Sequence, residues 1–281
     1  MKNKLSLFAV PYVGWMSIFV VAPIIIMVVY AFSTAAGDFT LENFARMGTY
    51  TAVFTRSFKL AIIATLIALL IGYPVSYMLS KEGPQVQRIA MVLIMLPMWM
   101  NFLLRTYSWM SILENNGLLN QLFQQIGLID LYNQVAMHFA ADPAAYVPID
   151  HFQMIGTQGA VVLGMVYNYL PFMILPIYSV LVKLDHSLIE AARDLGASSV
   201  QVFRKVILPL SLPGVLSGIT MVFVPSVSTF AISRLLGGGT QMMLGDLIEQ
   251  QFLGGAYNPQ LGAAIALVMM AIVVVCMLVM N

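Results

Sequence analysis

The chain has 281 residues, of which 60% are hydrophobic and only 9% are charged, and its formal net charge is +1. A typical soluble domain carries about 25% charged residues, so a soluble core cannot account for this composition. The near-zero charge gives no indication of a nucleic-acid partner, and the single cysteine, Cys276, excludes an internal disulfide and any CxxC motif.

Six apolar runs reach the roughly 20 residues that a helix needs to cross a bilayer. They cover residues 5–32, 58–79, 89–112, 159–182, 206–232 and 261–280. Each run must be helical, because an unsatisfied backbone group in hydrocarbon costs several kcal/mol. We therefore predict an all-α membrane protein with six transmembrane helices, in a single domain over residues 1–281. Prolines inside the runs predict kinks at Pro74, Pro97, Pro171, Pro176 and Pro225.

The first run follows Lys2 and Lys4, as the apolar segment of a signal peptide would. It is longer than such a segment and has no small-residue cleavage site near its end, so we predict that it is retained. With a cytoplasmic N-terminus, eight Lys and Arg residues lie inside and five outside. Because the positive-inside rule favours that bias, we predict that both termini are cytoplasmic.

The third run contains Arg105 towards its predicted outer end. The interpretation that we favour is an anchor that snorkels to the membrane surface; the alternative is a functional charge. The spans otherwise hold almost no ionisable group at mid-depth. Because an ion-coupled carrier usually needs such groups, the energy for uphill transport must come from another subunit.

The longest loop, residues 113–158, is predicted to lie outside. No Lys or Arg occurs between Thr106 and Val182, whereas the loop contains four acids: Glu114, Asp130, Asp142 and Asp150. A negative field predicts a docking surface for a partner with a basic patch. The alternative is a solvated connection between two spans.

The inner loop, residues 185–209, is predicted to form two short amphipathic helices. Ser187 can cap the first helix and Ser198 the second. Gly196 can supply the left-handed residue that ends the first helix. Its apolar positions recur at helical spacing: Leu188, Ala191, Ala192 and Leu195. A loop with this many apolar residues is expected to pack against another surface. A lipid surface is the alternative, but Glu190 and Asp194 are unfavourable against anionic headgroups.

Several signatures of other functions are absent from the sequence. No G-x-x-x-x-G-K-[ST] motif is present, so this chain is not expected to bind nucleotide phosphates. The three histidines, His138, His151 and His186, have no metal-ligand spacing, and no serine lies in a nucleophile motif. We therefore predict that the chain is not an enzyme and holds no metal or cofactor.

The inner loop resembles the EAA motif of ABC-importer permeases, EAA-x3-G-x9-I-x-LP. Glu190-Ala191-Ala192, Gly196 and Val206-x-Leu208-Pro209 match its spacing, with valine in place of isoleucine. The resemblance implies a type I ABC-importer permease fold in which this loop docks on a cytoplasmic ATPase. The residues that it assigns to this coupling are Glu190, Ala191, Ala192, Asp194, Gly196, Leu208 and Pro209.

Longer segments resemble spermidine/putrescine permeases, and especially the first of their two permease subunits. They are Pro97–Trp109, Asn115–Asp130 and Val166–Tyr178. The resemblance implies a multi-pass protein of the cytoplasmic membrane that pairs with a second permease, two ATPase subunits carrying ATP and magnesium, and an extracytoplasmic polyamine-binding protein. Two departures are the long stretch 131–163 and Thr229, near which some relatives carry an acid. A third is the absence of a basic tail after Asn281, which suggests truncation.

Aromatic rings can attract a polycation by about 0.5–2 kcal/mol each, and acids at the mouth can add attraction. The candidate path residues are Trp99, Tyr107, Trp109, Tyr167, Tyr169, Phe230, Asp246 and Glu249. We expect Trp99 and Trp109 to lie about 15 Å apart along one helix. The alternative for each aromatic residue is a ring that only packs in the protein or at the membrane surface, and the alternative for each acid is a solvated charge in an outer loop. Other functions that stay open are a permease for an amino acid or anion, an ion-coupled carrier and a membrane-embedded enzyme.

Overall fold

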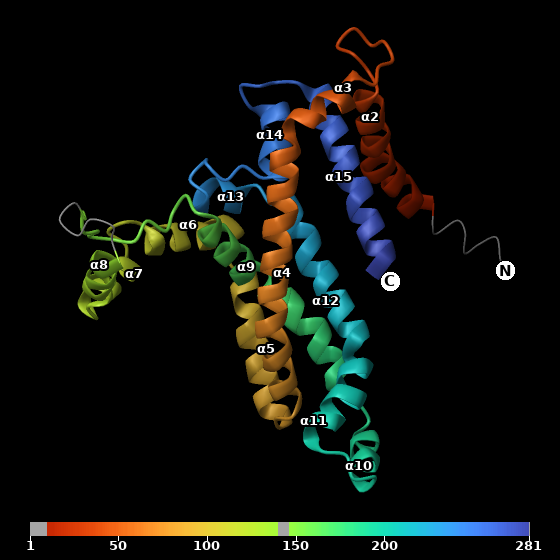
Figure 1. Cartoon of the computed structure of the whole chain (residues 1–281). Helices are drawn as coiled ribbons and strands as arrows, with labels where there is room; N and C mark the ends of the chain where they lie inside the picture. Colours follow the sequence, from red (N-terminus) through yellow and green to blue (C-terminus); the bar gives the residue numbers. More distant parts are fainter. Residues whose placement is uncertain (1–9, 140–145, 281) are drawn as a thin grey trace, which may run out of the picture. The chain divides into compact units, whose positions relative to one another are not determined.

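The computed structural model describes residues 10–139 and 146–280 (Figure 1). Within those ranges all regular elements are helical, apart from one isolated bridge between Ser33 and Phe39. The helices form two compact units. We call the first the flanking unit, which runs up to Thr55 and resumes at Leu244, and the second the core unit, Arg56–Met243.

Five helical stretches in the described ranges are long and apolar enough to cross a membrane. They are Val10–Ala31, Glu42–Ser80, Gln158–Leu181, Ser199–Ser228 and Pro259–Leu278. A sixth span consists of Pro84–Trp99 and Phe102–Gln125, which are bent by 90° at a short break. The described residues therefore agree with the six-helix prediction if the bent pair counts as one span, a broken one that the sequence analysis treated as continuous. Residues 5–9 of the first predicted span lie outside the described residues.

The flanking unit is organised around its last helix, α15 (Pro259–Met280). Against it pack α2 (Ala22–Ala31), α3 (Glu42–Arg46) and α14 (Leu244–Leu253). A π-helical turn, η1 (Ser17–Val21), precedes α2, and a 3-10 turn, η2 (Met47–Tyr50), follows α3. Small buried side chains, Ala31, Ala263 and Ala264, form the contact. They let the helix backbones approach closely, which is how helices associate where lipid removes the hydrophobic drive.

The core unit is built on α9 (Gln158–Leu181), which packs along α12 (Leu208–Ser228). Two glycines of α12 make this approach possible. A Cβ at Gly214 would lie 2.8 Å from the Pro176 carbonyl oxygen, and one at Gly218 would lie 2.8 Å from the Met173 sulfur. Any larger residue would therefore push the two helices apart.

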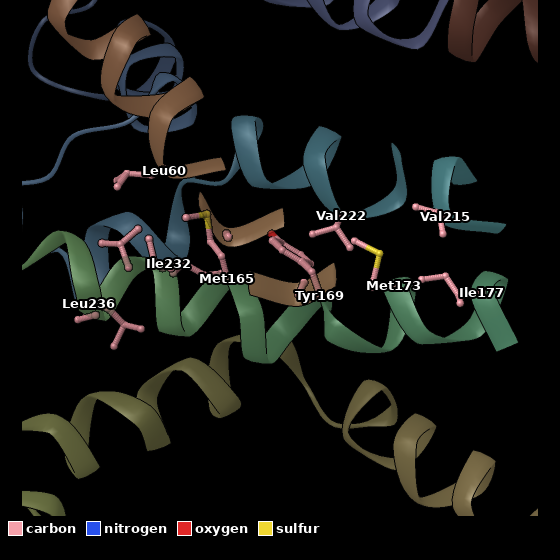
Figure 2. Packing of buried hydrophobic residues seen from close by; sticks show 14 of the residues in the cluster. Leu60, Met165, Tyr169, Met173, Ile177, Val215, Val222, Ile232 and Leu236 are labelled. Atoms are coloured by element: carbon pink, nitrogen blue, oxygen red, sulfur yellow. The ribbon is translucent and has the colours of Figure 1, made fainter. Parts of the chain in front are cut away.

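Buried side chains of α9 form the centre of the core unit (Figure 2). Met165, Tyr169, Met173 and Ile177 lie along α9, with Val222 of α12 beside them. The N-terminal half of α9 also packs against α13 (Ala231–Leu236). The helix α4 (Thr51–Ser80) completes the cluster with Leu60, two alanines and one glycine. The five prolines at which kinks were predicted all lie inside helices of this unit.

The remaining helices of the core unit extend from the two ends of α9 (Figure 1). At one end lie α6 (Phe102–Leu113), α7 (Leu118–Gln125) and α8 (Leu128–Phe139). At the other end lie α10 (His186–Asp194), α11 (Ser199–Val202) and the π-helical turn η3 (Phe203–Ile207). The helix α5 (Pro84–Trp99) runs beside α9 and joins α4 to α6.

Candidate functional site

The inner loop of residues 185–209, which we call the coupling loop, begins with a different cap from the predicted one. Asp185 precedes α10, and its carboxylate accepts a hydrogen bond from the Ser187 amide at 2.9 Å. The prediction that Ser187 caps the helix is therefore wrong by two residues. A carboxylate is well suited to this position, because it also interacts favourably with the positive end of the helix dipole.

The end of α10 is confirmed as predicted. Gly196 has a left-handed φ of +82°. Its amide donates to the Arg193 carbonyl at 2.8 Å, and the Ala197 amide donates to the Ala192 carbonyl at 3.1 Å. This is the Schellman pattern, in which two amides beyond the helix satisfy its last carbonyls. The turn to the next helix is consequently short and fully hydrogen-bonded.

The second helix starts at Ser198, also as predicted. The Ser198 hydroxyl accepts from the Gln201 amide at 3.4 Å, and the Gln201 side chain accepts from the Ser198 amide at 2.8 Å. This reciprocal capping box fixes the start of a continuous 30-residue helix, Ser199–Ser228. The second helix of the coupling loop is therefore continuous with the fifth span, α12.

The coupling loop has two faces, but they are not divided as predicted. Ile189, Ala192, Ala197, Val202 and Phe203 pack on the core. Leu188 and Leu195 instead face outward, with Leu195 90% exposed. The EAA residues Glu190, Ala191, Asp194 and Gly196 are exposed too, as are Leu208 and Pro209 at the start of α12. The outward face therefore combines acids with an apolar tip that nothing in the described chain covers.

The broken third span separates the two tryptophans that were expected on one helix. The helix α5 ends at Trp99, Met100 is extended, and Asn101 caps α6. The Asn101 side chain accepts from the Leu103 and Leu104 amides at 2.9 and 3.3 Å. Trp99 is 75% exposed. The expected 15 Å spacing of Trp99 and Trp109 along one helix is therefore wrong.

Two of the predicted path aromatics do lie together. The Trp109 and Tyr167 rings meet edge to face with centroids 5.3 Å apart. They line an apolar cavity of about 650 Å³ between α4, α6 and α9. Tyr169 is buried on another side of α9, and its hydroxyl donates to the Pro225 carbonyl at 3.5 Å. Tyr107 and Phe230 are each about half exposed.

The two predicted path acids belong to the flanking unit. Asp246 and Glu249 lie on α14, where the sequence analysis placed a loop. Asp246, in the first turn, is only 4% exposed, so the interpretation of a solvated acid is wrong for it. Glu249 is partly buried.

Arg105 is the residue whose environment the sequence analysis misjudged most. Its side chain is 8% exposed, so it is buried in the core unit and does not snorkel. Its Nε and Nη1 atoms have no hydrogen-bond acceptor among the described residues. An ionisable residue inside a span was the signal that could have indicated this buried position.

The outer loop is folded. The Asn120 amide group donates to the Phe152 carbonyl and accepts from the Phe152 amide, both at 3.0 Å. Asn133 makes the equivalent pair of bonds to Ile149 at 2.8 and 2.9 Å. Glu114, Asp130 and Asp150 are exposed, and Asp142 lies outside the described residues. No group of three His, Cys, Asp or Glu residues in the described ranges could hold a metal ion.

Residues 68–281 match the family described as "Binding-protein-dependent transport system inner membrane component". The chain is 36% identical over 252 residues to the spermidine/putrescine transport system permease protein PotB of Escherichia coli (strain K12), covering 87% of this chain and 85% of that protein. It is 36% identical over 261 residues to PotB of Haemophilus influenzae, covering 90% and 85% of the two chains.

Two solved structures resemble the whole chain or most of it. One is a bacterial ABC transporter involved in the import of the acidic polysaccharide alginate, with a TM-score of 0.78, 16% identity and coverage of 100% of this chain and 95% of that one. The other is the MetNI methionine ABC transporter in an inward-facing conformation, with a TM-score of 0.58, 18% identity and coverage of 84% and 94%. At these identities the likeness shows the fold.

Proposed function

This chain belongs to the binding-protein-dependent transport system inner membrane components, and we propose that it is the permease subunit of an ATP-driven importer that carries spermidine, putrescine or both. In this proposal it pairs with a second permease. Two cytoplasmic ATPase subunits hydrolyse ATP with magnesium, and an extracytoplasmic binding protein delivers the polyamine. The chain itself holds no cofactor and performs no catalysis.

The observation that carries the proposal is the two-faced coupling loop. Its inward face is packed on the core, and its outward face presents Glu190, Asp194 and the exposed Leu195. A leucine that is 90% exposed beside an acid, on a hydrogen-bonded turn, is typical of a surface that a partner covers. Because the loop continues into α12, ATPase closure can be transmitted to the spans as a rigid-body movement.

The polyamine assignment rests on the resemblance to relatives named for that substrate and on the aromatic rings of the core unit. Trp99, Tyr107 and Phe230 are partly or largely exposed, and aromatic ring faces attract ammonium groups without binding them tightly. That balance suits a path through which a polycation must pass.

One observation favours a second candidate. Arg105 is buried, and its Nε and Nη1 find no acceptor among the residues that the structure describes, so it would suit the carboxylate of an amino acid or another anion better than it suits an amine. The experiment therefore has to compare these substrates directly.

The test is uptake by the complete transporter in proteoliposomes, with ATP and magnesium inside and the binding protein outside. We expect accumulation of labelled spermidine or putrescine that requires ATP and is competed by unlabelled polyamine. Accumulation of an amino acid or anion without polyamine uptake would establish the second candidate. ATP-independent uptake that follows an ion gradient would contradict both.

A further inference from the structure

A cavity of about 330 Å³ lies in the core unit where the coupling loop meets the ends of α4 and α9. We call it the loop-base cavity. Its floor consists of five aliphatic side chains, among them Leu181 and Val202. Its polar lining consists of Lys81, Arg193, Ser80, Ser199 and the ring of Tyr77. No carboxylate is among the described residues that line it. The cavity lining therefore combines aliphatic side chains with two cations and no carboxylate among the described residues.

The two cations come from different parts of the fold. Lys81 directly follows α4, and its Nζ lies 3.8 Å from the centroid of the Tyr77 ring. Arg193 lies in the last turn of α10, inside the coupling loop. Tyr77 in turn packs edge to face on Phe203, with centroids 5.5 Å apart. The aromatic stack thus holds the Lys81 ammonium at the cavity.

Cations near the C-terminal end of a helix have an ordinary explanation: they offset the partial negative charge of its last carbonyl groups. Here backbone amides already bond such carbonyls. The Lys81 amide donates to the Met78 carbonyl at 3.1 Å, and the Gly196 amide donates to the Arg193 carbonyl at 2.8 Å. In addition, Ser199 is the first residue of a 30-residue helix, whose start carries a partial positive charge. The positive field at the cavity is therefore larger than helix capping requires.

The geometry points to a binding site for a phosphate-bearing anion in the loop-base cavity. The anion's oxygens would accept from Lys81, Arg193 and the Ser199 hydroxyl, which are donor types that bind phosphate, whereas the Ser80 hydroxyl already donates to the Tyr77 carbonyl at 2.9 Å. The aliphatic floor suits the glycerol and acyl portion of an anionic phospholipid, whereas free phosphate would use the polar lining alone. The two sources share the same headgroup chemistry.

Such an anion would tie the coupling loop to the body of the permease. Arg193 moves with α10, whereas Lys81 belongs to α4, so a shared phosphate restrains one against the other. The effect on energy coupling rests on the proposed function, but binding itself does not. For this reason the test measures binding through stability, in the absence of polyamine.

The complete transporter would be placed in nanodiscs of phosphatidylcholine, and its thermal unfolding would be followed in two titrations. One adds phosphatidylglycerol to the lipid, and the other adds inorganic phosphate against chloride at equal ionic strength. Stabilisation by the lipid alone identifies a phospholipid site, and stabilisation by phosphate identifies a free-anion site. Lys81→Gln and Arg193→Gln should each weaken the binding about tenfold, as for one lost charge-assisted hydrogen bond.

Lys183→Gln is the matched control, because Lys183 is an exposed cation just after α9 that does not line the cavity. It should titrate like the unchanged protein. Equal titrations for all four proteins, or no stabilisation in either arm, would overturn the inference. Should Arg193→Gln fail to assemble with the ATPase, Lys81→Gln still decides the question, since Lys81 lies outside the coupling loop.

Discussion

The coupling loop and the third span differ in how their shape is determined. In the coupling loop, Asp185, Gly196 and Ser198 each make hydrogen bonds to residues no more than three positions away. In the third span, a long apolar run is interrupted by one extended residue and turns through 90°. The loop is the more polar and exposed of the two, yet its geometry is the more strictly prescribed.

This difference shows that well-defined local hydrogen bonding in this protein is not confined to buried segments. The two helices of the loop are joined by a short turn whose amides bond the last carbonyls of α10, which suits the transmission of movement that we propose for it. The third span has exposed aromatic residues and a buried arginine, features that transport can use and that stability does not explain. Four predictions test this contrast.

The largest effect is expected at Gly196. Replacement by valine imposes a left-handed conformation on a β-branched residue, although a Cβ there would meet no atom within 4 Å. The strain of about 1–2 kcal/mol comes from the backbone alone and should misdirect the second helix. We expect substrate-stimulated ATPase activity of the complex to fall at least tenfold.

Two variants control for this. Gly196→Asn should retain most of the stimulation, because asparagine tolerates the left-handed region. Gly255→Val should also retain it, because Gly255 has open space around it and no positive φ. Full stimulation in Gly196→Val would mean that the loop is less rigid than its hydrogen bonds indicate.

The two tryptophans should respond differently, since only one of them is packed. Trp109→Leu removes an edge-to-face contact worth about 0.5–1.5 kcal/mol and should lower both thermal stability and polyamine uptake. Trp99→Leu removes an exposed ring and should lower uptake severalfold at unchanged stability, matching about 1 kcal/mol for one cation–π contact. Normal uptake in both variants would indicate that these rings serve only in packing or at the membrane surface.

Arg105→Met tests whether the buried charge is satisfied within this chain. A buried guanidinium with two nitrogens that find no acceptor among the described residues is costly, so the isolated permease should be no less stable and should gain up to about 1 kcal/mol. Arg88→Met, at an exposed position of α5, should change stability by less than about 0.5 kcal/mol. A loss of several kcal/mol in the Arg105 variant would show that its donors are bonded in the native protein.

The smallest effect concerns the outer loop. If its acids attract the binding protein, docking should weaken with salt, because the Debye length falls from about 10 Å at 0.1 M to about 3 Å at 1 M. Replacing Glu114, Asp130 and Asp150 by their amides should flatten this dependence. Each exposed charge contributes at most about 1 kcal/mol, so binding itself persists. Equal salt dependence with and without the three acids would exclude them from the docking surface.

The sequence by itself determined the helical spans and the turn of the coupling loop. Apolar runs of spanning length must be helical in lipid, and glycine and serine at Gly196 and Ser198 act on their immediate neighbours. Both kinds of signal are local, so no knowledge of the fold was needed. Even the misplaced cap of α10 was an error of two residues. The break at Asn101 carried a local signal too, an N-cap residue within an apolar run, which the hydropathy of its surroundings concealed.

Only the tertiary structure decided which side chains meet. The contact of Trp109 with Tyr167, the burial of Arg105 and Asp246, and the outward orientation of Leu195 depend on helices far apart in the chain. Helical periodicity says which residues share a face but not what that face packs against. In a chain with 60% hydrophobic residues nearly every face is apolar, so periodicity cannot choose between lipid, core and partner.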